Sequence, residues 1–188
     1  MNRSTEVVEL RERPPAVAGG DARRSLAFQR LVDEHLDRAY GLARAILRDA
    51  TEAEDATHDA FVRAWRSWPT LRDPARFEAW FDRIIVNTCR NRIRAAQRRP
   101  TDISDEIAQA IGDPYGQAED RDLLGAAVGT LSPDHQIVIA LRFYRDLPVE
   151  EIAARMGVPA GTVRSRLHYA LRRLHDAIDA PVAKGSIR

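Results

Sequence analysis

Two short amphipathic helices near the C-terminus constrain the fold of this chain more than any other stretch. Apolar side chains recur every three or four residues from Val149 to Met156, which predicts a helix with one buried face. Gly157 suits the left-handed backbone that often ends a helix, and Pro159 suits the first turn of a second helix. The spacing therefore favours a helix-turn-helix. The side chains that the second helix is expected to bury are Val163, Leu167, Ala170, Leu171 and Leu174.

The exposed face of this second helix is polar at its start and cationic along its length. Short polar side chains at the tip and arginines on the flank are typical of a recognition helix in a DNA major groove. A plain helical hairpin with a solvated basic face has the same pattern, because helical hairpins are common. The candidate DNA-binding residues on this face are Thr162, Arg164, Ser165, Arg166, His168, Tyr169 and Arg172.

The charges are unevenly distributed along the chain, although the formal net charge is only +1. Residues 83–99 and residues 160–175 each contain several arginines and no acid. Between them, residues 102–120 form an acidic interval. Two basic stretches on either side of an acidic spacer indicate two surfaces for a polyanion such as nucleic acid.

Helical periodicity also dominates the rest of the chain, and no stretch alternates as a half-buried strand would. Residues 25–47 carry a wide apolar stripe that suits one long helix or two helices with a bend. The sequence thus predicts an all-α fold with two small helical domains. The expected divisions are an N-terminal tail at 1–24, a first domain at 25–99, an acidic linker at 100–119, a second domain with the helix-turn-helix at 120–178 and a C-terminal tail at 179–188.

The helix predicted at residues 74–97 begins with aromatic side chains and ends with basic ones. Single-stranded nucleic acid needs both, since rings stack on bases and cations bind phosphates. The simpler alternative is that rings such as Phe77 and Phe81 belong only to the core. Trp68, in a loop bounded by prolines, is a better candidate for contact with a base.

Cys89 is the only cysteine, which excludes an intramolecular disulfide and fits a reducing cytoplasm. Residues 1–24 lack the apolar core of a signal peptide, and no stretch is long enough to span a bilayer. A cytoplasmic location without membrane insertion is therefore expected.

Three stretches, in this order, together resemble the bacterial sigma factors of the extracytoplasmic-function group. Residues 54–65 are similar to that family's core-polymerase-binding helix, and residues 77–88 to its promoter-opening helix. Residues 131–168 resemble its second domain, which contains the helix-turn-helix. The resemblance implies a non-enzymatic factor, without a cofactor, that binds core RNA polymerase, directs it to promoters and helps to open promoter DNA. It also implies an anti-sigma factor as a partner.

The resemblance further implies roles for residues at matching positions. Asp55, His58, Asp59 and Phe61 would dock on the clamp helices of the polymerase. The family usually has Gln-Glu where this chain has His58-Asp59, so the acidic side chain is shorter here and an imidazole could make the contact pH-dependent. Contacts with the minus-ten promoter element are implied for Trp68, Arg72, Trp80, Arg83, Asn87, Arg90 and Asn91.

For the minus-thirty-five element, the resemblance implies the exposed face of the last helix, with Thr162 and Arg166 nearer the DNA backbone. The family often has a basic residue where this chain has Tyr169. Tyrosine cannot supply the bidentate contact that arginine makes with guanine. Either Tyr169 touches a thymine methyl or a phosphate, or the promoter consensus differs from the usual one.

The predicted linker has a geometric task if this resemblance holds. The two promoter elements lie about 17 base pairs apart, which corresponds to about 60 Å of duplex. A linker at residues 100–119 reaches about 70 Å when pulled straight, so it must be nearly extended between them.

Two other functions remain open from the sequence. A helix-turn-helix regulator that binds duplex DNA without polymerase would explain residues 120–175 but not the helix at 74–97. An enzyme is suggested by Asp55 and His58, whose spacing is that of half a helical metal site. No matching carboxylate–histidine pair lies on a plausible partner helix, and the sequence shows no activated nucleophile or glycine-rich phosphate loop. We therefore expect no metal and no catalytic residue.

Overall fold

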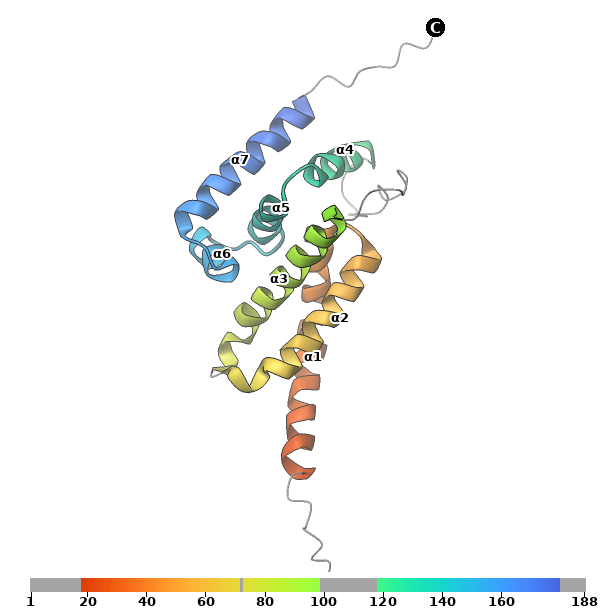
Figure 1. The fold of residues 1–188 in the computed structure, drawn as a ribbon, viewed down its shortest axis with the longest axis vertical. Coiled ribbons are helices and arrows are strands. Elements are labelled where there is room, and N and C mark those ends of the chain that lie inside the picture. The colour runs from red at the N-terminus through yellow and green to blue at the C-terminus, as the bar shows by residue number, and fades with distance from the viewer. Residues whose placement is uncertain (1–17, 72, 99–117, 180–188) are drawn as a thin grey trace, which may run out of the picture. The chain divides into compact units, whose positions relative to one another are not determined.

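The computed structural model describes residues 18–71, 73–98 and 118–179. Among these residues every regular element is helical, which confirms the all-α prediction (Figure 1). The α-helices are α1 (Ala18–Leu47), α2 (Ala50–Ser67), α3 (Phe77–Arg98), α4 (Ala118–Gly129), α5 (Pro133–Ile139), α6 (Val149–Met156) and α7 (Ala160–Asp179). The shorter elements are the 3₁₀ turns η1 (Trp68–Thr70) and η2 (Pro74–Arg76) and the π-helical turn η3 (Ala140–Tyr144).

The first helix is one unbroken element and begins at Ala18 rather than at Ser25. Residues 18–24, predicted as part of a tail, are helical because Ala22, Arg23 and Arg24 are strong helix formers. Residues 1–17, 99–117 and 180–188, which hold the rest of the predicted tails and most of the predicted linker, lie outside the described residues. Residues 1–34 and 35–188 form separate units, and the contacts discussed below lie within residues 35–188.

Side-chain caps and prolines set the boundaries of α2 and α3. Asp49 caps α2, and its Oδ1 atom accepts a hydrogen bond from the Glu52 amide at 2.7 Å. Asp73 accepts a hydrogen bond from the Ala75 amide at 3.0 Å, which starts the tight turn η2. The regular α-helix therefore begins at Phe77, three residues after the predicted start at Pro74.

Small residues on α2 let α3 approach it closely. Ala53, Ala56, Ala60 and Ala64 are fully buried along one face of α2. The rings of α3 fill the space that remains: Phe81 lies 4.4 Å from Phe61 and 5.4 Å from Phe77 between ring centroids. Phe77 and Phe81 are thus core residues, as the simpler alternative held.

In the C-terminal part of the chain, α4, α5 and α6 pack against the buried face of α7. Val163, Ala170 and Leu174 lie at the centre of that face, as predicted, and Leu167 is half-buried. Leu171, however, is 45% exposed. At 100° per residue it falls about 80° around the helix from Val163, at the edge of the apolar stripe.

The helix-turn-helix of α6 and α7 has the predicted turn. Gly157 ends α6 with φ 67°, in the left-handed region, and its amide donates to the Ala153 carbonyl. The Val158 amide donates to the same carbonyl at 3.1 Å. Pro159 lies just before α7 and accepts from the amides of Thr162 and Val163.

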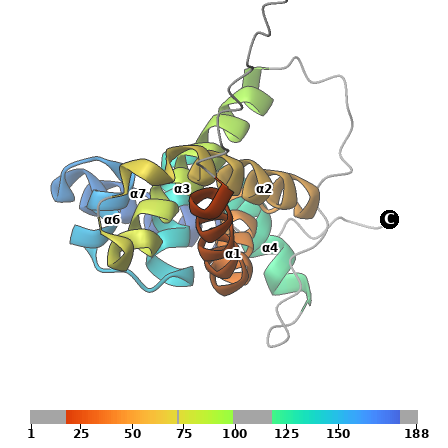
Figure 2. The ribbon, with the colours of Figure 1, turned by 90° about the horizontal axis from the view of Figure 1, so that it is seen from below.

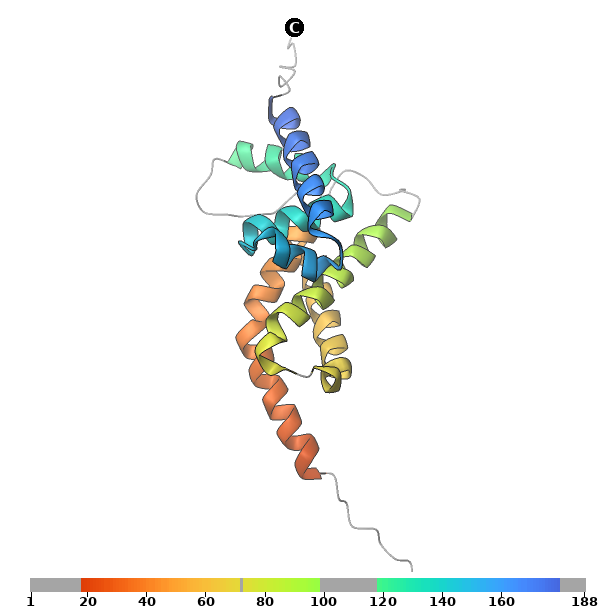
Figure 3. The same cartoon turned by 90° about the vertical axis from the view of Figure 1, so that its left-hand side faces the viewer.

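A second side of α3 is covered by α5 and α6 (Figures 2 and 3). The π-helical turn η3 lies between α5 and α6 in the chain. Its Arg145 amide donates to the Ala140 carbonyl at 3.2 Å, which closes a larger hydrogen-bonded ring than an α-helix has. Asp146 then has φ 50°. The sequence did not predict this turn, because its apolar residues continue the spacing of α5.

Candidate polymerase and DNA interfaces

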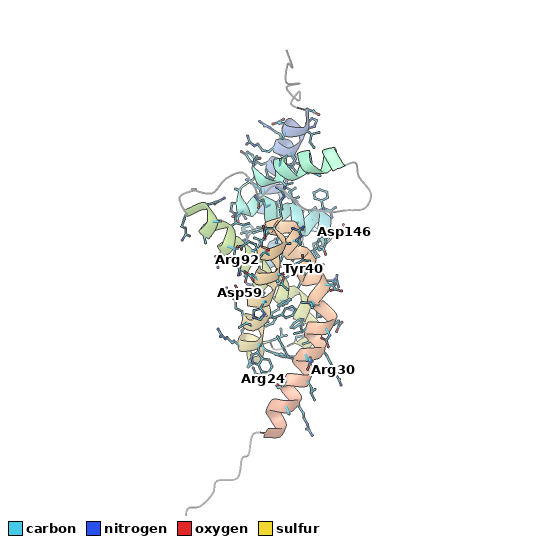
Figure 4. All side chains as sticks on the ribbon, turned by 90° about the vertical axis from the view of Figure 1, so that its right-hand side faces the viewer. Arg24, Arg30, Tyr40, Asp59, Arg92 and Asp146 are labelled. Carbon is cyan, nitrogen blue, oxygen red and sulfur yellow. The ribbon has the colours of Figure 1, made fainter. Side chains whose placement is uncertain are left out.

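The acidic face of α2 is organised around an arginine of α3. Arg92 binds Glu52 at 2.7 Å, Asp59 at 2.8 Å and Asp55 at 3.6 Å. Figure 4 labels Arg92 and Asp59 on their helices. Burial disfavours the charged guanidinium, but the hydrogen bonds that Arg92 donates to Asp59 and Glu52 raise its pKa overall. The arginine holds these carboxylates on one side of α2 without covering them. Neither Arg92 nor Glu52 was predicted as part of this site.

The four predicted polymerase contacts fall into two groups. Asp55 and His58 are exposed and Asp59 is half-buried, so all three side chains are accessible on the surface of α2. Phe61 is buried and packs on Phe81, so it supports this surface from beneath.

Tryptophans predicted to contact the minus-ten element surround Phe77. Trp68 and Trp80 are both half-buried, and their ring centroids lie 6.4 Å and 5.8 Å from that of Phe77. Trp65 meets Trp68 edge to face at 6.4 Å. These contacts hold the rings in place while leaving part of each accessible. Arg72 lies outside the described residues.

The polar residues predicted for the same element lie along α3. Arg83, Asn87 and Asn91 are exposed at four-residue spacing, which places them on one face of the helix. Arg90 is half-buried beside them. Its Nη1 atom donates to Asn87 Oδ1 at 2.8 Å, and its Nε atom donates to Asp134 of α5 at 2.9 Å.

The residues predicted for the minus-thirty-five element share one face of α7. Arg164, Ser165, His168, Tyr169 and Arg172 are exposed, and Thr162 and Arg166 are half-buried. Arg164 pairs with Glu150 of α6 at 2.9 Å, which fixes its guanidinium at the start of α7. Arg166 pairs with Asp134 at 2.8 Å.

Tyr169 stacks on an imidazole rather than standing away from the helix. Its ring centroid lies 4.7 Å from that of His135, with 25° between the ring planes. Ser132 and His135 Nδ1 share a hydrogen bond at 2.8 Å, which orients the imidazole. Burial and the positive charge of Arg166 lower the pKa of His135, against a smaller opposite effect of Asp134. The imidazole beside Tyr169 therefore binds a proton less readily than a free histidine does.

Two carboxylates that sequence reasoning missed connect α3 with the last four helices. Asp82, on the buried side of α3, binds Arg145 at 2.6 Å and Arg155 at 2.9 Å. Asp134 binds Arg90 and Arg166, one through each of its oxygens. The sequence did hint that Asp82 is unusual, since it is an acid within an apolar run. Its partners could not be predicted from local spacing, because they lie 63 and 73 residues away in the sequence.

Among residues 18–71, 73–98 and 118–179, no three or more His, Cys, Asp or Glu side chains are arranged to hold a metal ion. Within these ranges no helix is both long and apolar enough to cross a membrane.

Two protein families and several known proteins match most of this chain in sequence. Sigma-70 region 2 matches residues 31–99, and Sigma-70, region 4 matches residues 127–176. The ECF RNA polymerase sigma factor SigL of Mycobacterium tuberculosis is 34% identical over 163 residues, which cover 84% of this chain and 92% of SigL. This chain belongs to the extracytoplasmic-function sigma factors. The RNA polymerase sigma-E factor of Streptomyces coelicolor is 32% identical over 157 residues. This match covers 82% of this sigma factor and 88% of sigma-E.

Solved structures share the fold of this sigma factor. CnrH in complex with the cytosolic domain of CnrY has a TM-score of 0.60 at 29% identity, with 88% of this chain and 94% of CnrH covered. The sigma factor RpoE in complex with the anti-sigma factor NepR, from Bartonella quintana, has a TM-score of 0.68 at 23% identity. That match covers 82% of this chain and 98% of RpoE.

The family assignment decides between the two DNA-binding functions that the sequence left open. Region 2 spans α2 and α3, the part that a polymerase-independent regulator left unexplained. Region 4 spans the helix-turn-helix. The chain is therefore a sigma factor, a class of transcription initiation factor.

Proposed function

We propose that this sigma factor docks on core RNA polymerase through α2, opens the minus-ten element with α3 and the loop before it, and binds duplex minus-thirty-five DNA with α7. The observation that carries the proposal is the match of region 2 and region 4 to the two basic helices, in that order. We also propose a division into domains at 25–99 and 120–178, joined by an acidic linker at 100–119, with residues 1–24 and 179–188 outside both domains.

Docking on the polymerase uses the exposed side chains Asp55 and His58 with the half-buried Asp59. Arg92 holds the two aspartates in place from the side of α3. Phe61 contributes by fixing α2 on α3 rather than by an open surface of its own. A preformed acidic face loses less conformational entropy on binding than mobile side chains would.

Opening of the minus-ten element requires a base to leave the stack, which costs a few kcal/mol. The partly accessible rings of Trp68 and Trp80 offer a stacking surface in exchange. Asn87 and Asn91 suit the edges of bases, and the proposed phosphate contacts are Arg72, Arg83 and Arg90.

Recognition of the minus-thirty-five duplex falls to the exposed face of α7. Arg164, Ser165, His168 and Arg172 face the bases, while Thr162 and Arg166 lie nearer the backbone. Tyr169 is held against His135, so we assign it to an apolar or phosphate contact at the side of the groove. An arginine at this position would make a bidentate contact with guanine that tyrosine cannot make.

Two further parts of the proposal concern the cellular setting. We assign the chain to the cytoplasm, where RNA polymerase acts, and to no reaction of its own. An anti-sigma factor is a proposed partner, supported by the likeness to CnrH, whose structure was solved in complex with CnrY.

In vitro transcription with purified core polymerase on a genomic DNA library tests this function. We expect transcripts that start at a shared promoter sequence, which the products define. A chain carrying both Asp55→Ala and Asp59→Ala should give far fewer transcripts, while Arg66→Ala, another exposed change on α2, should not. No transcripts from the wild-type chain, or tight operator binding that needs no polymerase, would overturn the proposal.

A further inference from the structure

We propose that Ser132 and His135 of α5 are positioning residues that hold the Tyr169 ring of α7 as a rigid apolar surface for one thymine methyl group of the minus-thirty-five element. This role rests on the proposed function of α7, and it names the base that Tyr169 reads. It also adds two residues of a second helix to a surface that the sequence placed on α7 alone.

The Tyr169 ring is supported by one neighbour and still accessible to another. Its centroid lies 4.7 Å from that of the His135 imidazole, and the two ring planes differ by 25°, so the rings are stacked. Tyr169 nevertheless remains 50% exposed. A tyrosine side chain has only two rotatable bonds, so a stacked neighbour removes much of its freedom before DNA arrives. A ring ordered in advance loses less conformational entropy on binding than a mobile one.

The hydroxyl of Ser132 contacts the imidazole instead of capping the helix. Ser132 is the N-cap residue of α5, where a serine side chain usually accepts a hydrogen bond from a backbone amide of the first turn. Here the side chain makes no capping bond, and its Oγ atom lies 2.8 Å from His135 Nδ1. The Ser132 carbonyl still accepts from the amides of His135 and Gln136. The hydroxyl therefore orients the imidazole while the backbone alone starts α5.

The charges around the two rings favour an apolar group over a phosphate. Burial, followed by the positive charge of Arg166, lowers the pKa of His135, so the imidazole is less often a cation. Arg166 itself pairs with Asp134 at 2.8 Å, so a carboxylate offsets its charge beside the rings. A phosphate gains little attraction from such a surface. A methyl group, in contrast, is removed from water when it packs on the exposed part of the Tyr169 ring.

The apolar surface selects one base. Thymine is the base that presents a methyl group in the major groove, where apolar side chains contact it. An arginine at position 169 would favour guanine through a bidentate contact, which a tyrosine ring cannot make. Tyr169 therefore predicts a thymine at the position of the minus-thirty-five element that it faces.

The test is binding of the full-length chain, assembled with core polymerase, to promoter duplexes in which thymine is replaced by deoxyuridine. Deoxyuridine keeps the pairing edge and the O4 atom of thymine and lacks only the methyl group. In the promoter that in vitro transcription defines, each thymine of the minus-thirty-five element is replaced in turn, on either strand. We expect one replacement to lower the affinity of the wild-type chain about fourfold, the effect of removing one methyl group from a buried contact.

Substitutions in the stack should change this discrimination to different extents. Tyr169→Ala should abolish it, whereas Tyr169→Phe keeps the ring and should retain it. His135→Ala should reduce it to about twofold or less, because the ring must then be ordered on binding. His135→Phe restores a stacked ring and should recover the discrimination. Phe143→Ala removes an exposed ring of η3 and is the control that should leave it unchanged.

A double substitution isolates the hydroxyl of Ser132. Ser132→Ala should weaken the discrimination in the wild-type chain but not in His135→Phe, because phenylalanine has no nitrogen for the hydroxyl to bond. The stability of the chain, measured by urea unfolding, should change little, since the Ser132 hydroxyl does not cap α5.

Two results would overturn the thymine contact. In one, no replacement by deoxyuridine changes the affinity of the wild-type chain. In the other, Tyr169→Ala weakens binding to the thymine and deoxyuridine duplexes equally, as loss of a phosphate contact would. Full discrimination in both His135→Ala and Ser132→Ala would overturn the positioning roles. Each of these results leaves the proposed function standing while the wild-type chain transcribes, whereas a wild-type chain that gives no transcripts removes both.

Discussion

The helices α3 and α7 are both rich in arginine but differ in how much of each is covered. The helix α7 packs through one face against α4, α5 and α6, and its predicted DNA-binding side chains are mostly exposed. The helix α3 is packed on α2 and also against α5 and α6, with Asp82 buried between. The helix proposed to bind an intact duplex keeps that face exposed, whereas the helix proposed to open the duplex is covered by α2 and also by α5 and α6.

The largest difference between the two helices should appear in stability. Phe81→Ala on α3 removes a ring that packs on both Phe61 and Phe77, and should lower the free energy of unfolding by about 3–5 kcal/mol. Leu171→Ala on α7 removes a side chain that is 45% exposed and should cost less than about 1 kcal/mol. Urea unfolding of both variants measures this. Equal losses would mean that α7 is packed on a second side as well.

Variants of the two helices should affect different steps at a promoter, strand opening for α3 and duplex binding for α7. Asn87→Ala on α3 should reduce strand opening about tenfold, the loss expected for one base contact, with little change in duplex affinity. Arg172→Ala on α7 should instead weaken duplex binding and reduce its salt dependence by about one counterion. Permanganate footprinting reports the first step and binding at several salt concentrations the second. If Asn87→Ala weakens duplex binding as much as Arg172→Ala does, the division of tasks is wrong.

A smaller effect is expected at the support that α3 gives to α2. Arg92→Ala leaves Glu52, Asp55 and Asp59 without their shared cation, so these carboxylates repel one another and spread. We expect polymerase affinity to fall about fivefold, because a partly exposed charge cluster contributes about 1 kcal/mol. Arg94→Ala removes an exposed arginine of the same helix and serves as the control. An unchanged affinity for Arg92→Ala would show that the acidic face needs no support.

The smallest expected effect is a pH dependence of stability beside α7. Since the folded chain lowers the pKa of His135, the unfolded chain binds the proton more readily. Stability that is present above about pH 6.5 is therefore lost as the pH falls through and below that value. His135→Asn should flatten this part of the profile, while His168→Asn, at an exposed position, should keep it. Chemical denaturation from pH 8 to about pH 5.5 gives the comparison. If His135→Asn lost more stability than the wild type as the pH falls, the predicted direction of the pH dependence would be wrong.

The same contrast explains how far the sequence predicts this molecule. The fold of α6 and α7 follows from local rules: apolar spacing, a left-handed glycine and a proline at the turn. The core roles of Phe77 and Phe81 follow from spacing as well. The contacts of Asp82 do not, because periodicity within α3 says nothing about partners 63 and 73 residues away. Arg92 was missed for a related reason, since in the sequence it is one arginine of a basic run.

For Tyr169, the sequence revealed the departure from the family but not the contact that the side chain makes. The departure from a basic residue was visible in the sequence, but its stacking partner His135 was not, since the two lie on different helices. The early start of α1 at Ala18 was missed because glycines near that end obscured strong helix formers after it.

Asp134 has one consequence for how promoters are chosen. Because it binds an arginine from each proposed DNA surface, release of Arg90 and release of Arg166 are energetically linked. A promoter that draws Arg166 away leaves the whole charge of Asp134 to Arg90, so the departure of Arg90 becomes harder, and the reverse holds equally. Occupancy of the two elements would then be negatively coupled even without any contact between them on DNA. A promoter with one strong and one weak element would be used less than the separate affinities of the two elements suggest.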